Sequence, residues 1–86
     1  GMGVPELFTI TGYDTKLHIT DWSDMTKENI DYINQQLEEY EYIFVNQDVP
    51  NIITKINDEY ELVNEYEYKY NFGSESYLFG LYRRKE

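Results

Sequence analysis

The sequence predicts an α+β fold, a two-layer sandwich in which a mostly antiparallel sheet carries two helices on one face. The C-terminal segment alternates apolar and polar residues with a period of two, which is typical of a strand. A central segment repeats apolar residues at spacings of three and four, as an amphipathic helix does. Short apolar runs surround it, so that the expected order is β-β-α-β-α-β-β within one domain of 86 residues.

The C-terminal hairpin has the clearest pattern. Every second residue from Tyr66 to Phe72 is aromatic, and the residues between them are polar. Gly73-Ser74 predicts a two-residue type II′ turn, because Gly supplies the positive φ that its first position requires. We therefore expect one aromatic sheet face that packs into the core. The expected register pairs Phe72 with Glu75, Tyr70 with Tyr77, Tyr68 with Phe79 and Tyr66 with Leu81.

The N-terminal part predicts a first hairpin. Residues 6–11 and 16–20 are rich in β-branched and apolar residues, and 12–15 is a turn candidate between them. Gly1 before Met2 is interpreted as the remnant of a cleaved tag. These residues are followed by the central helix, so a strand–helix–strand unit from 16–20 to 42–46 is expected.

The first helix is expected at about 26–40. Thr26 is the predicted N-cap, and Met25 and Ile30 have the spacing of a hydrophobic staple. The apolar stripe of this helix consists of Ile30, Ile33, Leu37 and Tyr40.

The next three elements are shorter. Residues 42–46 predict a strand buried on both faces, since the run is short, apolar and β-branched. Pro50 favours the first turn of a second helix at about 50–59. Residues 83–86 are expected to form a basic tail.

Composition narrows the classes of function. The chain has 17 acidic and 7 basic residues, a net charge of −10, which disfavours direct binding to nucleic acid or to an anionic membrane. It has no Cys, so disulfides, thiolate metal sites and Cys nucleophiles are excluded, and a cytoplasmic location is favoured. No run reaches the roughly 20 apolar residues of a membrane span, and no signal peptide is expected.

Few residues are candidates for a catalytic, metal or ligand site. His18 is the only histidine, and we expect it at the surface, without the partners of a catalytic base or a metal ligand. The junction at 21–24 brings together Asp21, Trp22 and Asp24, which favours helix capping with one aromatic anchor over a ligand or cation site. We expect no catalytic residue, no metal and no cofactor.

The last third of the chain resembles the end of a small bacterial family of unknown function. That family ends in a helix, a Gly-Trp-Glu-Leu-Val segment and a hairpin with a basic exit. The corresponding residues here are 57–63, the hairpin ending 77–79, and Arg83-Arg84, with Glu59-Tyr60 in place of Gly-Trp. The resemblance implies a fold and no catalytic residue.

We therefore expect a non-enzymatic protein-interaction or regulatory domain that binds another protein. Its acidic composition suits a basic partner, and self-association is left open. The first alternative is an acidic nucleic-acid mimic that inhibits a nucleic-acid-binding protein. The second is a small-ligand domain that uses the junction at 21–24. The candidate interaction residues are Glu59, Glu61, Glu65, Glu67 and Trp22.

Overall fold

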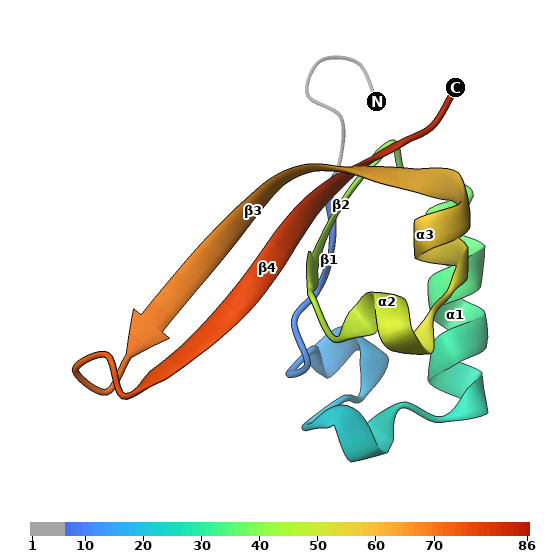
Figure 1. The fold of residues 1–86 in the computed structure, drawn as a ribbon. Helices are drawn as coiled ribbons and strands as arrows, with labels where there is room; N and C mark the ends of the chain where they lie inside the picture. The colour runs from blue at the N-terminus through green and yellow to red at the C-terminus, as the bar shows by residue number, and fades with distance from the viewer. Residues whose placement is uncertain (1–6) are drawn as a thin grey trace.

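The structure, a computed structural model, describes residues 7–86 (Figure 1). Its centre is a four-stranded mixed sheet in the order β1-β2-β4-β3. The predicted α+β class is confirmed. Gly1 and Glu6, on which two of the sequence-based interpretations fall, lie outside the described residues. The strands are β1 (Leu7–Ile10), β2 (Tyr42–Asn46), β3 (Tyr60–Tyr70) and β4 (Glu75–Arg84).

The predicted N-terminal hairpin is wrong, because residues 16–20 do not form a strand. Thr15–Leu17 is a 3-10 turn (η1), and His18 after it has a φ of 55°. The Asp14 carboxylate accepts hydrogen bonds from the N–H groups of Thr11 (2.6 Å) and Gly12 (3.2 Å), so the chain turns back on itself. β1 instead pairs in parallel with β2, the two being connected through the α1 helix.

Helix α1 (Lys27–Leu37) confirms the predicted N-cap and the stripe as far as Leu37, and it ends three residues before the expected position 40. The Asn29 N–H donates to the Thr26 hydroxyl at 3.3 Å. Ile33 and Leu37 are buried, whereas Ile30 and Tyr40 are partly buried against the same core.

The predicted second helix is two short helices, α2 (Val49–Ile52) and α3 (Lys55–Glu59). They are separated at Ile53, whose φ of −111° and ψ of 85° are not helical. The run from Ile52 to Thr54 is β-branched throughout, and such residues have a lowered helix propensity. The break leaves Ile53 buried in the core beside the helices.

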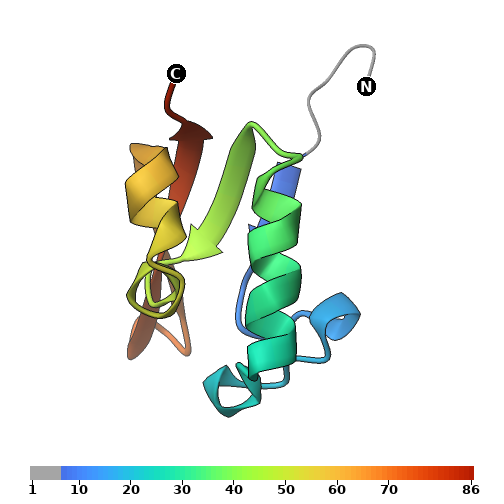
Figure 2. The ribbon, with the colours of Figure 1, turned by 90° about the vertical axis from the view of Figure 1, so that its right-hand side faces the viewer.

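All helices lie against one face of the sheet (Figure 2). On that face, Ile43 and Val45 of β2 are fully buried. Tyr42 and Phe44 point to the opposite face, which no helix covers, and are only half-buried. The expectation that this strand is buried on both faces is therefore wrong.

The hairpin forms, but in a different register. Tyr70 lies opposite Glu75, Tyr68 opposite Tyr77 and Tyr66 opposite Phe79. The loop contains four residues, 71–74, and positive φ occurs at Asn71 (53°), Phe72 (56°) and Gly73 (84°). Only the positive φ at Gly73 was predicted. A shift of two residues preserves the face of every side chain, so the aromatic residues still share one face.

That aromatic face does not pack into the core, contrary to the prediction. α1 has 11 residues and β3 also has 11. At about 1.5 Å per helical residue and 3.3 Å per strand residue, α1 covers roughly 16 Å whereas the strand spans roughly 36 Å. The hairpin therefore extends beyond the helices, as Figure 1 shows. We call residues 60–62 and 80–84 the base of the hairpin, and residues 64–79 its arm.

Candidate functional site

The uncovered face of the sheet carries a row of aromatic side chains, which we call the aromatic face. Tyr66 lies opposite Phe79, and Phe44 lies opposite Leu81, so their side chains share the face that points away from the helices. A β-bulge at Val63 sets this arrangement, because the even-numbered residues of β3 face the helices before it and the outside after it. The aromatic face consists of Phe44, Tyr66, Tyr68, Tyr70, Tyr77 and Phe79.

The rings support one another. Phe44 stacks on Phe79 with centroids 5.3 Å apart and also contacts Tyr66 at 5.9 Å. Tyr70 stacks on Tyr77 at 5.3 Å, and their hydroxyl oxygens are 2.7 Å apart. This hydrogen bond, followed by that to Glu75, raises the pKa of Tyr70. The face is ordered by its own contacts, yet Tyr66 and Tyr68 remain 45% and 62% exposed.

Two hollows lie on this side of the molecule. The first, which we call the junction pocket, has a volume of about 440 Å³ and lies between the arm and the loops that follow β1 and β2. The second, the arm hollow, has a volume of about 470 Å³ and is lined by Phe44, Tyr66, Glu67, Tyr68 and Phe79. Tyr68 and Phe79 line both, so the two hollows adjoin. The junction pocket is lined by Thr11, Gly12, Tyr13, Asp21, Trp22, Asn46, Asp48, Tyr68, Tyr77 and Phe79.

Trp22, which the sequence singled out, is one wall of the junction pocket. Gly12 has a φ of +98°, and a Cβ there would lie 3.0 Å from the Trp22 ring. The loop after β1 therefore approaches the indole closely because Gly12 has no side chain. Trp22 is also partly buried against the core. The predicted aromatic anchor is confirmed.

The carboxylates of the 21–24 junction cap a 3-10 turn, η2 (Trp22–Asp24). Asp21 accepts from the Ser23 N–H at 2.7 Å, and Asp24 accepts from the Thr20 N–H at 2.6 Å. Hydrogen bonds from the Thr20 side chain and backbone, and from the Asp21 N–H, lower the pKa of Asp24 below its ordinary value of 3.8. The two carboxylates thus cap this 3-10 turn and not, as expected, the following helix, and Asp21 in addition lines the junction pocket.

The four candidate glutamates do not form one row. Glu61 lies opposite Arg83, on the side of the sheet away from the helices, whereas Glu65 and Glu67 lie beyond the bulge and point to the other side. Each has a polar partner in the structure. Lys55 pairs with Glu59 (3.5 Å), Arg83 with Glu61 (3.3 Å) and Lys69 with Glu67 (3.3 Å), while Gln47 donates to Glu65 (3.3 Å).

The predicted basic tail is largely structural. Arg83 and Arg84 belong to β4, a central strand of the sheet. The Arg84 guanidinium donates to the carbonyls of Leu37 and Tyr40 at the C-terminal end of α1, the latter at 2.9 Å. It also lies 5.6 Å from the centre of the Tyr60 ring.

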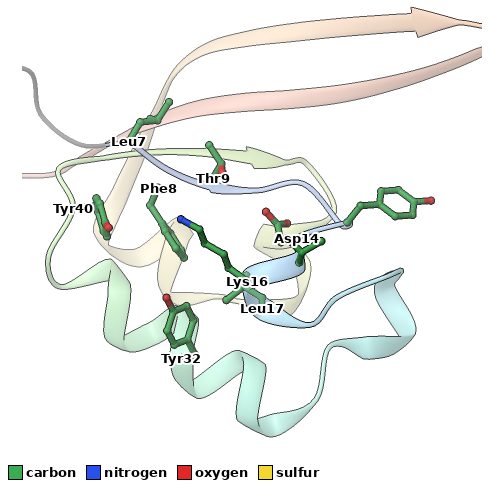
Figure 3. Close-up of a pocket in the computed structure, with 10 residues that line it drawn as sticks. Leu7, Phe8, Thr9, Asp14, Lys16, Leu17, Tyr32 and Tyr40 are labelled. Carbon is green, nitrogen blue, oxygen red and sulfur yellow. The ribbon is translucent and has the colours of Figure 1, made fainter.

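A further hollow of about 350 Å³ lies between β1, η1 and α1 (Figure 3). Its aromatic lining is Phe8, Tyr13, Tyr32 and Tyr40, and the Lys16 side chain reaches along it. Asp14, its acidic residue, is already used in the turn after β1. We therefore regard this hollow as a by-product of the N-terminal turns and place the candidate site on the aromatic face.

Other classes of site have little support in residues 7–86. His18 is exposed, as expected. No group of three or more His, Cys, Asp or Glu in this part of the chain is placed to hold a metal ion. None of the helices described here is long and apolar enough to cross a membrane.

Comparisons with known proteins add no relative: no protein-family model matches the chain, and neither the curated proteins nor the solved structures gave a match. The resemblance of the last third to a bacterial family of unknown function stays a prediction. We therefore infer the function from the site alone.

The sequence reasoning missed part of this site. Phe44 was placed in a buried strand, and Tyr13, Asn46 and Asp48 were not singled out. A signal existed in the lengths of the predicted elements, because two short helices cannot cover both faces of a sheet that contains a long hairpin.

Proposed function

We propose that this protein is a non-enzymatic interaction domain that binds an extended, basic segment of another protein along its aromatic face. The main observation that supports this proposal is the row of aromatic rings, which are ordered but exposed on a sheet face that none of the described helices covers. Tyr is favoured at protein interfaces because its ring gives contact area at a low cost in conformational entropy. Contiguous exposed apolar surface of this kind marks interaction sites in soluble proteins.

The shape and charge of the surface support this choice of partner. The junction pocket and the arm hollow adjoin through Tyr68 and Phe79, which suits consecutive side chains of an extended segment. Acidic residues border the junction pocket, which Asp21 and Asp48 line. With a net charge of −10, the chain favours a basic segment over an acidic one.

The nucleic-acid mimic receives less support from the geometry. A mimic needs acidic side chains aligned on one surface at phosphate-like spacing. Glu61 is separated from Glu65 and Glu67 by the sheet, and Glu61 and Glu67 are neutralised locally by Arg83 and Lys69.

A selection from a library of displayed random peptides tests the proposal. The wild-type protein should enrich basic sequences, and a Tyr66→Thr/Tyr68→Thr variant should bind those peptides at least tenfold more weakly. Threonine keeps strand propensity, so the arm should persist. Leu78→Thr is the matched control, because Leu78 is 45% exposed on the other face of the same arm, and it should bind as the wild type does.

Three outcomes would overturn the proposal. One is failure of the wild type to enrich any peptide family, and another is equal loss of binding in the control variant. The third is a dimer in sedimentation velocity that dissociates in the Tyr66→Thr/Tyr68→Thr variant, which would assign the face to a second copy of the chain.

A further inference from the structure

We propose that the junction pocket is an arginine-binding site, which receives the guanidinium group of the partner segment. This deepens the proposed function and rests on it for the identity of the partner as a protein. The pocket shares Tyr68 and Phe79 with the arm hollow, but its other eight lining residues do not line that hollow, so substitutions among those eight test it separately.

The walls of the pocket are aromatic. Five of its ten lining residues are Tyr13, Trp22, Tyr68, Tyr77 and Phe79. Faces of aromatic rings carry negative electrostatic potential, so they attract cations, and Trp and Tyr do so most strongly. Among cationic side chains, the planar guanidinium group of Arg also stacks on such rings, whereas the Lys ammonium is compact and strongly hydrated.

The polar side chains of the pocket include oxygen atoms that can bind a cation. Asp21 and Asp48 contribute carboxylates, and none of the ten described residues in the lining is basic. The Asp48 N–H donates to the Asn46 side-chain oxygen at 3.0 Å, and Asn46 itself is buried, so this end of the pocket is fixed by a local turn. The Asp21 carboxylate is fixed from the other side by its bond to Ser23.

The pocket is large enough for one arginine side chain, both its guanidinium group and its aliphatic stem. Its volume of about 440 Å³ lies near the lower end of the roughly 300–1,000 Å³ of small-molecule sites. The adjoining arm hollow, which shares Tyr68 and Phe79, is then available to the residue that follows the arginine. A cation at the junction and an apolar contact on the arm would thus fix the direction of the bound segment.

Trp22 provides a direct probe, because it is the only tryptophan of the chain and lies in the pocket wall. We would titrate the protein with N-acetyl-arginine methylamide and follow the indole N–H resonance of Trp22. The neutral isostere, N-acetyl-citrulline methylamide, and the lysine analogue serve as ligand controls. Arginine should shift the resonance and saturate, whereas citrulline and lysine should bind several-fold more weakly.

Asp48→Asn removes one carboxylate and should weaken arginine binding roughly two- to fivefold, since an exposed charge pair of this kind is worth up to about 1 kcal/mol. Citrulline binding should not change. Asp31→Asn is the matched control, because it removes the same charge from an exposed position on α1, where Lys27 pairs with Asp31 at 3.8 Å. It should bind arginine as the wild type does.

Equal binding of arginine and citrulline, no effect of Asp48→Asn, or an equal effect of Asp31→Asn would overturn the arginine site. Lysine binding as strongly as arginine would overturn the assignment to a guanidinium group. None of these outcomes decides the peptide selection, because the arm hollow also contains Phe44 and Tyr66, which do not line the junction pocket. A failed selection with intact arginine binding would instead contradict the proposed function alone.

Discussion

The base and the arm of one hairpin place the same kind of residue in opposite environments. Tyr60 and Tyr82 at the base are 2% and 6% exposed, whereas Tyr66 and Tyr68 on the arm are 45% and 62% exposed. The β-bulge at Val63 separates the two pairs: Tyr60 and Tyr82 face the helices, whereas Tyr66 and Tyr68 face the uncovered side of the sheet. The comparison teaches that alternation defines which side chains share a face only as far as the next bulge, and that burial then depends on which face the helices cover.

The base is tied to the helical layer by polar contacts as well as by burial. The Tyr60 hydroxyl donates to the Leu37 carbonyl at 2.7 Å, at the end of α1, and accepts from the Arg84 guanidinium at 3.1 Å. The Tyr82 hydroxyl donates to the Gln47 side-chain oxygen at 2.9 Å. The Tyr60 and Arg84 contacts satisfy α1 carbonyls that have no partner within the helix. The arm has rings stacked on rings and no helix against it.

The largest effect is expected for Tyr60→Ala. The change removes a fully buried ring and the hydrogen bond to Leu37, so the free energy of unfolding should fall by about 3–5 kcal/mol. Urea denaturation followed by far-UV circular dichroism measures it. Tyr60→Phe, which keeps the ring, should cost about 1 kcal/mol. A loss below about 1 kcal/mol for Tyr60→Ala would mean that the base is not part of the core.

A smaller effect is expected for Gly80→Ala, where the base passes into the arm. A Cβ at Gly80 would lie 2.7 Å from the Tyr82 ring and 2.9 Å from a Leu62 methyl. Overpacking at such a position costs about 1–3 kcal/mol. A Cβ at Gly73 on the arm would meet no atom within 4 Å, but φ is +84° there, so Gly73→Ala should cost only the roughly 1 kcal/mol of left-handed backbone. Thermal unfolding of both variants checks this order, and the reverse order would contradict it.

The smallest expected effect is on the ionisation of Tyr70 and Tyr82, whose pKa values are raised for different reasons. Burial raises the pKa of Tyr82, whereas the hydrogen bond with Tyr77 raises that of Tyr70. Because both pKa values lie above the ordinary 10.0, these groups contribute stability below pH 10 that is lost as pH rises through their folded pKa values.

Tyr77→Phe should therefore lower the pKa of Tyr70 toward its ordinary value and leave that of Tyr82 unchanged. An NMR titration of the tyrosine ring resonances above neutral pH resolves the two. If Tyr82 moved as much as Tyr70, the base and the arm would not be independent environments.

Much of the fold could be predicted because its signals are local. The α1 stripe, the Thr26 cap, β2, the start of α2 near Pro50 and the common face of the hairpin aromatics all follow from periodicity and capping. The aromatic anchor Trp22 in the 21–24 junction was also predicted, although the carboxylates beside it cap a 3-10 turn and not the expected helix.

The parts that were wrong depend on non-local competition. Residues 16–20 have strand-forming composition, but the Asp14 carboxylate stabilises a turn before them, and β2 pairs with β1 instead. The hairpin register moved by two because the loop uses four residues, three of them with positive φ. The assignment of the aromatic face to the core failed because the β-bulge at Val63 turns the arm aromatics to the sheet face away from the helices. The junction pocket was not predictable in full, since Asp48 and Tyr68 meet there only through this topology.

The most direct test of the account compares stability and binding in one variant, Tyr66→Thr/Tyr68→Thr. If the aromatic face is a working surface, the free energy of unfolding should change by less than about 1 kcal/mol, because both side chains are largely exposed. The affinity for the selected basic peptides should fall at least tenfold in the same preparation. A loss of several kcal/mol in stability, or unchanged peptide affinity in the folded variant, would contradict the account.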